Sequence, residues 1–242
     1  MTQEQLIEIY KHTKEVCSEF EVPKSEKLTI GSSVLFDKKK TGAITVEPLD
    51  TVSALAKYVN NGKTAVLNMA SHKRKGGGVE RGAMAQEECL FRCSNLFTIP
   101  DEFYPLAMNE FVYTHQAVFV KGGDYGTIWP MDADVITMAA PNLNKENKNC
   151  NAHEVEGIYE DIMKKKINAM LDVAASNDCD NIILGAWGCG VFKNDPATVA
   201  RLFKDILETK RYLFEKIVFA VINDKNSVGN NYQIFEETLN GI

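Results

Sequence analysis

One stretch of the sequence combines residues that could do chemistry with residues that could hold a ligand. Three glycines, Gly76-Gly77-Gly78, follow the apolar run 64–68, and after a seven-residue spacer comes Gln86-Glu87-Glu88. Glycine has no side chain to keep a ligand from the backbone, and 83–97 has the helix formers and apolar stripe of a helix. We therefore expect a strand, a ligand-binding loop and a helix whose first turns carry both carboxylates. Carboxylates in such a place predict acid–base chemistry.

A second glycine-rich segment has the features of an anion-binding turn. It runs from Leu184 to Pro196 and precedes a helix that we expect at 196–210. A diphosphate needs several converging N–H donors, which a glycine turn before a helix supplies together with the positive end of the helix dipole. The expected contacts are Gly188, Cys189, Gly190, Val191 and Phe192, and the Phe192 ring could also pack on a ribose or a base. The alternative is a tight turn that only packs a strand against a helix.

Other chemistries fit these residues less well. No Gly-Lys-Ser or Gly-Lys-Thr follows the first glycines, which argues against Walker-type phosphate binding. Cys189 has no histidine tied to it by spacing, and its glycine neighbours explain it as a small filler, so we reject a thiol nucleophile. Two glutamates in a first helical turn can simply complement the helix dipole, but the adjacent glycines favour catalysis. Because successive helical residues point about 100° apart, Glu87 and Glu88 should have separate duties.

Together the two segments resemble the signature of a known family. Three glycines, the spacer and Gln-Glu-Glu look like the signature of microbial-type poly(ADP-ribose) glycohydrolases, a branch of the macrodomain superfamily. The segment 184–196 is similar to the diphosphate-binding loop of that family, and family-like stretches at 66–71 and 134–142 extend the resemblance over most of the chain. The resemblance implies one domain, 1–242, with a macrodomain-like three-layer α/β/α arrangement around a mixed sheet, and an N-terminal helical extension at 1–26.

The resemblance also implies a role for each site residue. Glu88 would be the general acid and base, Glu87 would orient the scissile ribose through its hydroxyls, and Gln86 would support the pocket. The substrate-binding residues implied in this part of the chain are Asn68, Gly76, Gly77, Gly78, Val79 and Gln86. For Asn68, the alternative is a turn residue that ends the strand. Ser71 stands where related sequences often have asparagine, which departs from the family pattern.

The activity that the resemblance implies is hydrolysis of the ribose–ribose O-glycosidic bond of poly(ADP-ribose) from the chain end, with release of ADP-ribose. Such a bond breaks through an oxocarbenium-like state, so the leaving oxygen needs a proton and a water needs a base, and one glutamate can serve both in turn. This route requires no metal and no organic cofactor. Poly(ADP-ribose) or ADP-ribosylated proteins would be the substrate. A mono(ADP-ribosyl) or O-acyl-ADP-ribose hydrolase, or a binding module without turnover, are the alternatives.

Composition sets the outer bounds of function. A chain of 242 residues with 45% hydrophobic content can bury one sizeable core. The formal charge of −6 argues against binding to DNA, and no apolar run is long enough for a bilayer. The N-terminus lacks the form of a secretory signal, so we expect a soluble, cytoplasmic protein. Six cysteines without a CxxC pair and four histidines without ligand spacing predict reduced cysteines and no metal.

Apolar patterns predict the elements that must position the two loops. Helices are expected at 4–20, 51–60, 154–175, 196–210 and 232–239, and strands at 43–47, 64–68, 118–121, 134–139, 181–186 and 217–222, with one or two short strands in 27–36. The stretches outside these elements are an irregular excursion at 100–111, a turn at 122–126, a basic surface turn at 38–40 and a polar loop at 141–151 that could form a wall of the site. Because helices alternate with strands, the ligand should lie at the carboxyl ends of a largely parallel sheet.

Overall fold

A computed structural model describes residues 1–31, 42–209, 212, 214–224, 227 and 229–240. The basic run at 38–40, and the later part of the strands expected in 27–36, lie outside these residues. The chain divides into two compact units. Unit 1 comprises Met1–Thr29 and Asp50–Ala139, and unit 2 comprises Ile30–Leu49 and Ala140–Ile242. The expectation of a single domain stays a prediction.

Unit 1 is built on four strands in the order β1-β4-β5-β3. They are β1 (Ser25–Thr29), β3 (Thr64–Met69), β4 (Glu110–Lys121) and β5 (Thr127–Met138). β4 pairs antiparallel with β1 and β5, whereas β3 runs parallel to β5 and places Asn68 opposite Thr137. β3 is buried from Thr64 to Asn68, as its continuous apolar run predicts, so its end delivers the chain from the interior to the glycine loop.

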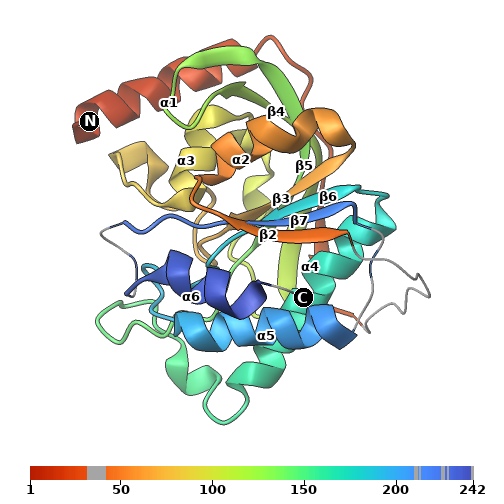
Figure 1. The fold of residues 1–242 in the computed structure, drawn as a ribbon. Helices are drawn as coiled ribbons and strands as arrows, with labels where there is room; N and C mark the ends of the chain where they lie inside the picture. Colours follow the sequence, from red (N-terminus) through yellow and green to blue (C-terminus); the bar gives the residue numbers. More distant parts are fainter. Residues whose placement is uncertain (32–41, 210–211, 213, 225–226, 228, 241–242) are drawn as a thin grey trace. The chain divides into compact units, whose positions relative to one another are not determined.

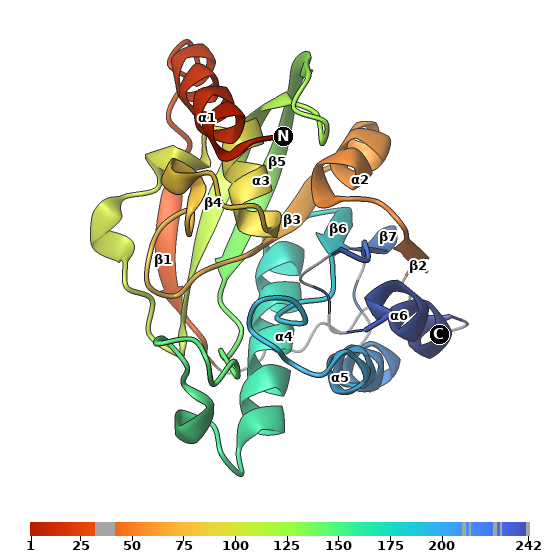
Figure 2. The same ribbon diagram turned by 90° about the vertical axis from the view of Figure 1, so that its left-hand side faces the viewer.

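Three helices cover the strands of unit 1, α1 (Gln3–Cys17), α2 (Thr51–Tyr58) and α3 (Gln86–Cys93). α3 lies between α1 and α2 and contacts β3 and β4 (Figure 2). Asp50 caps α2 because its Oδ1 accepts the N–H groups of Val52 and Ser53. The short 3-10 helices of this unit are η1 (Val59–Asn61), η2 (Val79–Arg81), η3 (Leu96–Thr98) and η4 (Asp101–Phe103).

Unit 2 has three parallel strands in the order β6-β7-β2. Its elements are β2 (Ala43–Glu47), η5 (Ala152–Glu154), α4 (Tyr159–Ser176), β6 (Asn181–Leu184), α5 (Pro196–Thr209), β7 (Lys216–Ala220) and α6 (Asn231–Leu239). α5 lies between α4 and α6, and α6 also packs on β2 (Figure 1). The glycine-rich segment that the sequence marks as a diphosphate loop joins β6 to α5.

The helix that carries the carboxylates is shorter than the expected 83–97. Ala85 has an extended backbone, with φ −134°, because its N–H donates to the Glu88 carboxylate and the helix starts only after it. At the other end Ser94 is again extended, and its hydroxyl donates to the carbonyl of Leu90. The expected position of the Gln-Glu-Glu triplet in the first turn is confirmed.

Three other predicted boundaries were wrong. β5 starts at Thr127, before the strand expected at 134–139. The strand expected at 118–121 is only the end of β4, which starts within the excursion expected at 100–111; a bulge around Gln116, with φ 47°, interrupts the alternation that would have shown its length. The helix expected from 154 begins at Tyr159, because a 3-10 turn precedes it.

In the part of the chain that the structure describes, no helix has the length and apolar character needed to cross a membrane.

Candidate active site

Gln86 joins the end of β3 to the start of α3. Its side-chain oxygen accepts the N–H of Met69 at 2.8 Å, and its Nε2 donates to the carbonyl of Leu67 at 2.7 Å and to the hydroxyl of Thr51 at 3.1 Å. One side chain thus connects β3, α2 and α3. Gln86 therefore fixes the frame from which the two glutamates project.

The glycine run forms a turn with backbone angles that other residues rarely adopt. Gly76 and Gly77 have φ values of 66° and 57°. A Cβ at Gly77 would overlap Oε1 of Glu88 and lie 3.0 Å from Oε2 of Glu87. Val79 closes the turn, because its N–H donates to the carbonyl of Gly76 at 3.0 Å and its side chain is buried. The bare glycine backbone thus lies directly against both carboxylates.

Backbone N–H groups hold the Glu88 carboxyl on both sides. Its Oε1 accepts from Gly78 and its Oε2 from Ala85, each at 2.8 Å. A glutamate at the third helical position commonly reaches back in this way to the residue that precedes the helix. The side chain is only 7% exposed. These bonds fix its orientation, while each carboxylate oxygen keeps capacity for a further hydrogen bond.

Glu87 has a different environment. Its Oε2 accepts the N–H of Ser71 at 2.8 Å, but its buried Oε1 has no hydrogen-bond partner among the described residues. Burial raises the pKa of Glu87 well above its usual value despite the N–H bond from Ser71, and the charge of Glu88 raises this pKa further. Glu87 therefore holds a proton more readily than an ordinary glutamate.

Two more buried polar atoms near Glu87 lack partners within the described chain, Oδ1 of Asn68 and the hydroxyl of Tyr104. Asn68 donates from Nδ2 to Thr137 at 3.3 Å, and its side chain also favours the ionised form of Glu87. Burial raises the pKa of Tyr104 well above its usual value, and the charge of Glu87 raises this pKa further. Because buried polar groups are normally hydrogen-bonded, the unpaired Oε1 of Glu87 together with these two atoms indicates a binding site. No pattern in the sequence singles out Tyr104.

The N-terminal helix is tied to the glycine loop through a buried arginine. Nε of Arg92 donates to the carbonyl of Leu6 at 3.2 Å, and its Nη2 donates to the carbonyl of Ala83. In return the hydroxyl of Thr13 donates to the carbonyl of Arg92. The sequence predicts an N-terminal extension here, whereas α1 supports the segment between the glycines and α3.

The second predicted loop follows β6 and leaves several N–H groups free. The N–H of Cys189 donates to Ala186 at 3.1 Å, whereas those of Gly190, Val191 and Phe192 have no acceptor in the described residues. Successive free N–H groups in a turn form a concave site for an anion. Burial raises the pKa of the Cys189 thiol, which agrees with a filler rather than a nucleophile.

Asn194 holds this loop in place. Its buried Nδ2 donates to the carbonyls of Pro141 at 2.8 Å and Gly188 at 3.1 Å, and its Oδ1 accepts the hydroxyl of Tyr159 at 2.7 Å. A Cβ at Gly188, where φ is 79°, would lie 2.8 Å from Cβ of Ala140 and from Nδ2 of Asn194. Asn194 is not among the residues predicted from the sequence. The one sequence feature that could have indicated it is its position between the glycine turn and the start of α5.

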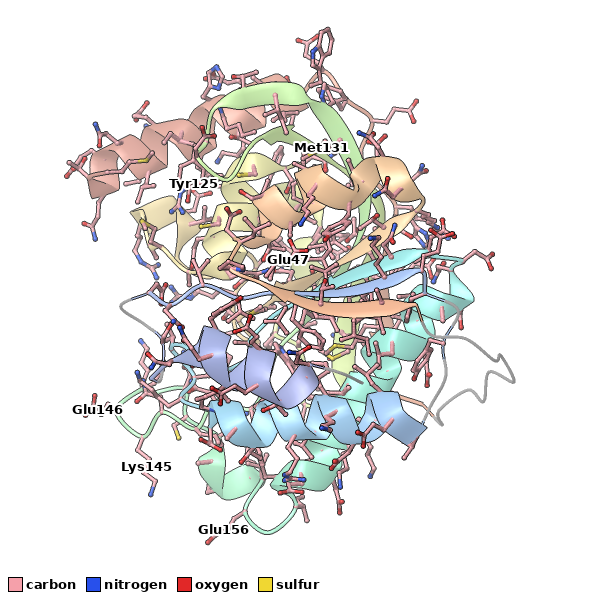
Figure 3. The ribbon with its side chains drawn as sticks, in the orientation of Figure 1. Glu47, Tyr125, Met131, Lys145, Glu146 and Glu156 are labelled. Carbon is pink, nitrogen blue, oxygen red and sulfur yellow. The ribbon has the colours of Figure 1, made fainter. Side chains whose placement is uncertain are left out.

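The polar loop that is expected to form a wall of the site contains Leu143 and Asn144 and contacts this second loop. The N–H of Leu143 donates to the carbonyl of Phe192 at 2.9 Å, and Nδ2 of Asn144 donates to that of Val191 at 3.1 Å. Glu146, nearer the tip, points away from the ribbon (Figure 3). The polar loop therefore supports the expected diphosphate contacts from one side.

The structure brings the predicted residues together in two groups. Unit 1 gathers Asn68, Gly76–Val79, Gln86, Glu87 and Glu88, and unit 2 gathers Gly188–Phe192. That both groups bind one ligand stays a prediction. All six cysteines are free, and no cluster of three or more potential metal ligands occurs within the described ranges.

The matching family model and the two solved structures compared with this chain are of poly(ADP-ribose) glycohydrolases. Residues 3–122 match the family model described as "Microbial-type PARG, catalytic domain". The crystal structure of poly(ADP-ribose) glycohydrolase (PARG) from Thermomonospora curvata has a TM-score of 0.82 and 22% identity, over 97% of this chain and 99% of that one. PARG from Deinococcus radiodurans, in complex with ADP-ribose, has a TM-score of 0.72 and 26% identity, over 99% of this chain and 92% of that one.

No curated protein matches the chain. The likeness to solved structures confirms the expected macrodomain-like, mixed α/β fold class. The family match begins inside α1, in agreement with the contacts that tie this helix to the glycine loop. Residues 3–122 therefore match the microbial-type PARG family, and the chain as a whole shares the fold of the solved PARG structures.

Proposed function

We propose that this chain hydrolyses poly(ADP-ribose) by cleaving the ribose–ribose O-glycosidic bond and releasing ADP-ribose. One observation carries the proposal: two adjacent buried carboxyls lie against a glycine turn, one held by two N–H bonds and the other with a raised pKa and a free oxygen. Glycoside hydrolysis uses carboxyl groups in separate roles, and these two carboxyls have different surroundings. The structure of Deinococcus radiodurans PARG with ADP-ribose supports the same ligand class here.

Glu88 is assigned as the general acid and base. Its carboxyl is held in one orientation by Gly78 and Ala85, so it can meet the scissile bond without reorganisation. It gives a proton to the leaving ribose oxygen as the C–O bond breaks, and then takes a proton from the water that adds to the oxocarbenium-like carbon. The proton taken from water replaces the proton given to the leaving oxygen, so Glu88 returns to its starting protonation state.

Glu87 and Asn68 are assigned to the ribose hydroxyls. Each has one buried oxygen without a partner in the described chain, and both oxygens can accept a hydrogen bond from a hydroxyl group. The raised pKa of Glu87 also lets it donate while it is neutral. In this proposal Gln86, Gly76–Gly78 and Val79 shape the loop that presents these groups.

The diphosphate is assigned to the 188–192 loop. The free N–H groups of Gly190, Val191 and Phe192 precede α5, whose N-terminus adds the positive end of a helix dipole. The half-buried Phe192 ring would pack on a ribose or a base. We propose that this loop and the carboxylate loop bind the same ADP-ribose group. Cleavage from the polymer end and a cytoplasmic location stay predictions.

Glu88→Gln tests the assignment most simply. Glutamine keeps the size of the side chain but cannot transfer the proton, so we expect polymer cleavage to fall about 10³-fold. Calorimetric titration should show ADP-ribose affinity within a few-fold of wild type, which also verifies the fold. Glu80→Gln is the matched control, because this glutamate of the same loop is exposed and should be dispensable.

Near-full turnover by Glu88→Gln would contradict the assignment. Loss of turnover in Glu87→Gln, with Glu88→Gln active, would exchange the two roles. Tight ADP-ribose binding by a wild type that cleaves nothing would identify a binding module, and cleavage restricted to singly modified protein would identify a mono(ADP-ribosyl) hydrolase. ADP-ribose as the sole product would support action from the polymer end.

A further inference from the structure

The segment that carries Tyr104 is anchored to the glycine loop on both sides of that residue. The N–H of Leu106 donates to the carbonyl of His72 at 2.8 Å. Before Tyr104, Asp101 pairs with Nζ of Lys75 at 2.6 Å. Both partners, His72 and Lys75, belong to the stretch between β3 and the three glycines. Tyr104 is therefore held beside the carboxylate site and is not a residue of a free surface loop.

The Tyr104 hydroxyl contributes nothing to the fold. It is buried and has no hydrogen-bond partner among the described residues, so folding removes it from water without compensation. Tyr113 of unit 1 shows the usual arrangement of a buried tyrosine hydroxyl, because it donates to the carboxylate of Asp134. A phenylalanine would fill the space at position 104 equally well. The hydroxyl therefore needs an explanation outside the folded chain.

The three unpaired atoms around Glu87 complement a sugar diol. Oδ1 of Asn68 can only accept a hydrogen bond, and Oε1 of Glu87 can accept one too. Together they can therefore accept hydrogen bonds from two hydroxyl groups. The Tyr104 hydroxyl can donate its own proton to a sugar oxygen. Two neighbouring ribose hydroxyls offer two donors and two oxygen acceptors, which satisfies all three groups at once.

We propose that Tyr104 is a third ribose-contacting residue, whose hydroxyl donates a hydrogen bond to a ribose oxygen of the substrate beside Glu87 and Asn68. This inference rests on the proposed function, since it names a further contact at the same site. The contact positions the sugar and is present before the bond breaks.

Tyr104→Phe removes the hydroxyl and keeps the ring. Loss of one hydrogen bond to an uncharged ligand group should weaken ADP-ribose binding by about tenfold, measured by calorimetry. In a polymer-cleavage assay KM should rise by a similar factor while kcat stays within about threefold, because the contact exists in the ground state. The melting temperature of the free protein should stay the same or rise, since no internal hydrogen bond is lost.

Tyr113→Phe is the matched control. It removes a hydroxyl that is bonded inside the fold, so we expect a lower melting temperature and unchanged ADP-ribose affinity. Wild-type affinity and KM in Tyr104→Phe would overturn the inference. A drop in melting temperature like that of Tyr113→Phe, without a change in affinity, would show a structural hydroxyl and overturn it as well.

The two proposals fail in different ways. If the wild type binds ADP-ribose but does not cleave the polymer, the hydrolase proposal fails, while the affinity of Tyr104→Phe still decides the contact. If the wild type cleaves the polymer and Tyr104→Phe does so with unchanged KM, only the contact is wrong. A wild type that neither binds ADP-ribose nor cleaves polymer would overturn both.

Discussion

The glycine loops of the two units use their backbone N–H groups in opposite ways. In unit 1 the N–H groups of Ser71, Gly78 and Ala85 donate to the chain's own glutamates. In unit 2 the N–H groups of 190–192 donate to nothing within the described residues. The first loop thus already contains its anion, and the second is open to receive one.

This difference suits the two glycine loops to the different roles that we propose for them. A carboxyl that is held by the backbone and shielded from water can act on a bond at a fixed place. Free N–H groups at a helix start bind a charged group from outside the chain. The glycines differ accordingly: a side chain at Gly77 would displace the carboxyls of Glu87 and Glu88, whereas one at Gly188 would press on the residues that hold its own loop.

Gly77→Ala should have the largest effect on the first loop. The new Cβ would overlap Oε1 of Glu88, and the left-handed φ costs about 1 kcal/mol or more for a residue with a side chain. Because a small misplacement of a catalytic group can cost about 100-fold in rate, we expect a loss of about that size in polymer cleavage.

Gly157→Ala separates carboxyl displacement from backbone strain. Gly157 also has a left-handed φ, 75°, but a Cβ there would meet no atom within 4 Å. This variant should lose a similar amount of stability in thermal unfolding and keep full cleavage activity. Equal activity losses in the two variants would mean that strain alone accounts for the effect, and the contrast between the loops would disappear.

A smaller effect should appear in the pH dependence of stability. The folded pKa of Glu87 lies well above its ordinary value of 4.5, so between the unfolded and the folded pKa the folded protein binds more protons than the unfolded chain. The free energy of unfolding contributed by Glu87 therefore falls as pH rises through this range. Glu87→Gln has no proton to lose and should gain stability relative to wild type as pH increases from about 4.5.

Denaturant unfolding of both proteins across this pH range measures the difference. The slope of the difference with pH is the readout, since the amide also changes the local hydrogen bonds. Glu80→Gln controls for the loss of one acidic side chain from the same loop. A constant difference between wild type and Glu87→Gln at all pH values would show that burial does not raise the pKa of Glu87, and would contradict the environment described for its carboxyl.

Features of the site that are formed by residues close together in the sequence could be predicted. A buried apolar strand, three glycines and a triplet at a helix start lie within about 25 residues, so their order alone placed Glu87 and Glu88 beside the turn. The free N–H groups of 190–192 follow in the same way from a glycine turn before a helix. The alternation of strands and helices predicted a mixed sheet with helices, whereas the macrodomain-like class came from the family resemblance.

Contacts between distant segments could not be read in this way. Tyr104 reaches the site because its loop is anchored to the 71–75 stretch, and Arg92 connects α1 to the glycine loop through two carbonyls. Neither residue has a spacing or a motif that signals such a role. The length of β4 was missed because one bulge at Gln116 shifts the side-chain alternation by a residue.

The central claim is that the two loops bind one ADP-ribose. The most direct measurement is an NMR titration of the isotope-labelled Glu88→Gln variant with ADP-ribose, following the backbone amides of Gly76–Gly78, of 190–192 and of Gly157 as a reference. The account predicts that the first two groups shift with the same dissociation constant and that Gly157 does not move. Shifts confined to one loop, or two different dissociation constants, would contradict it.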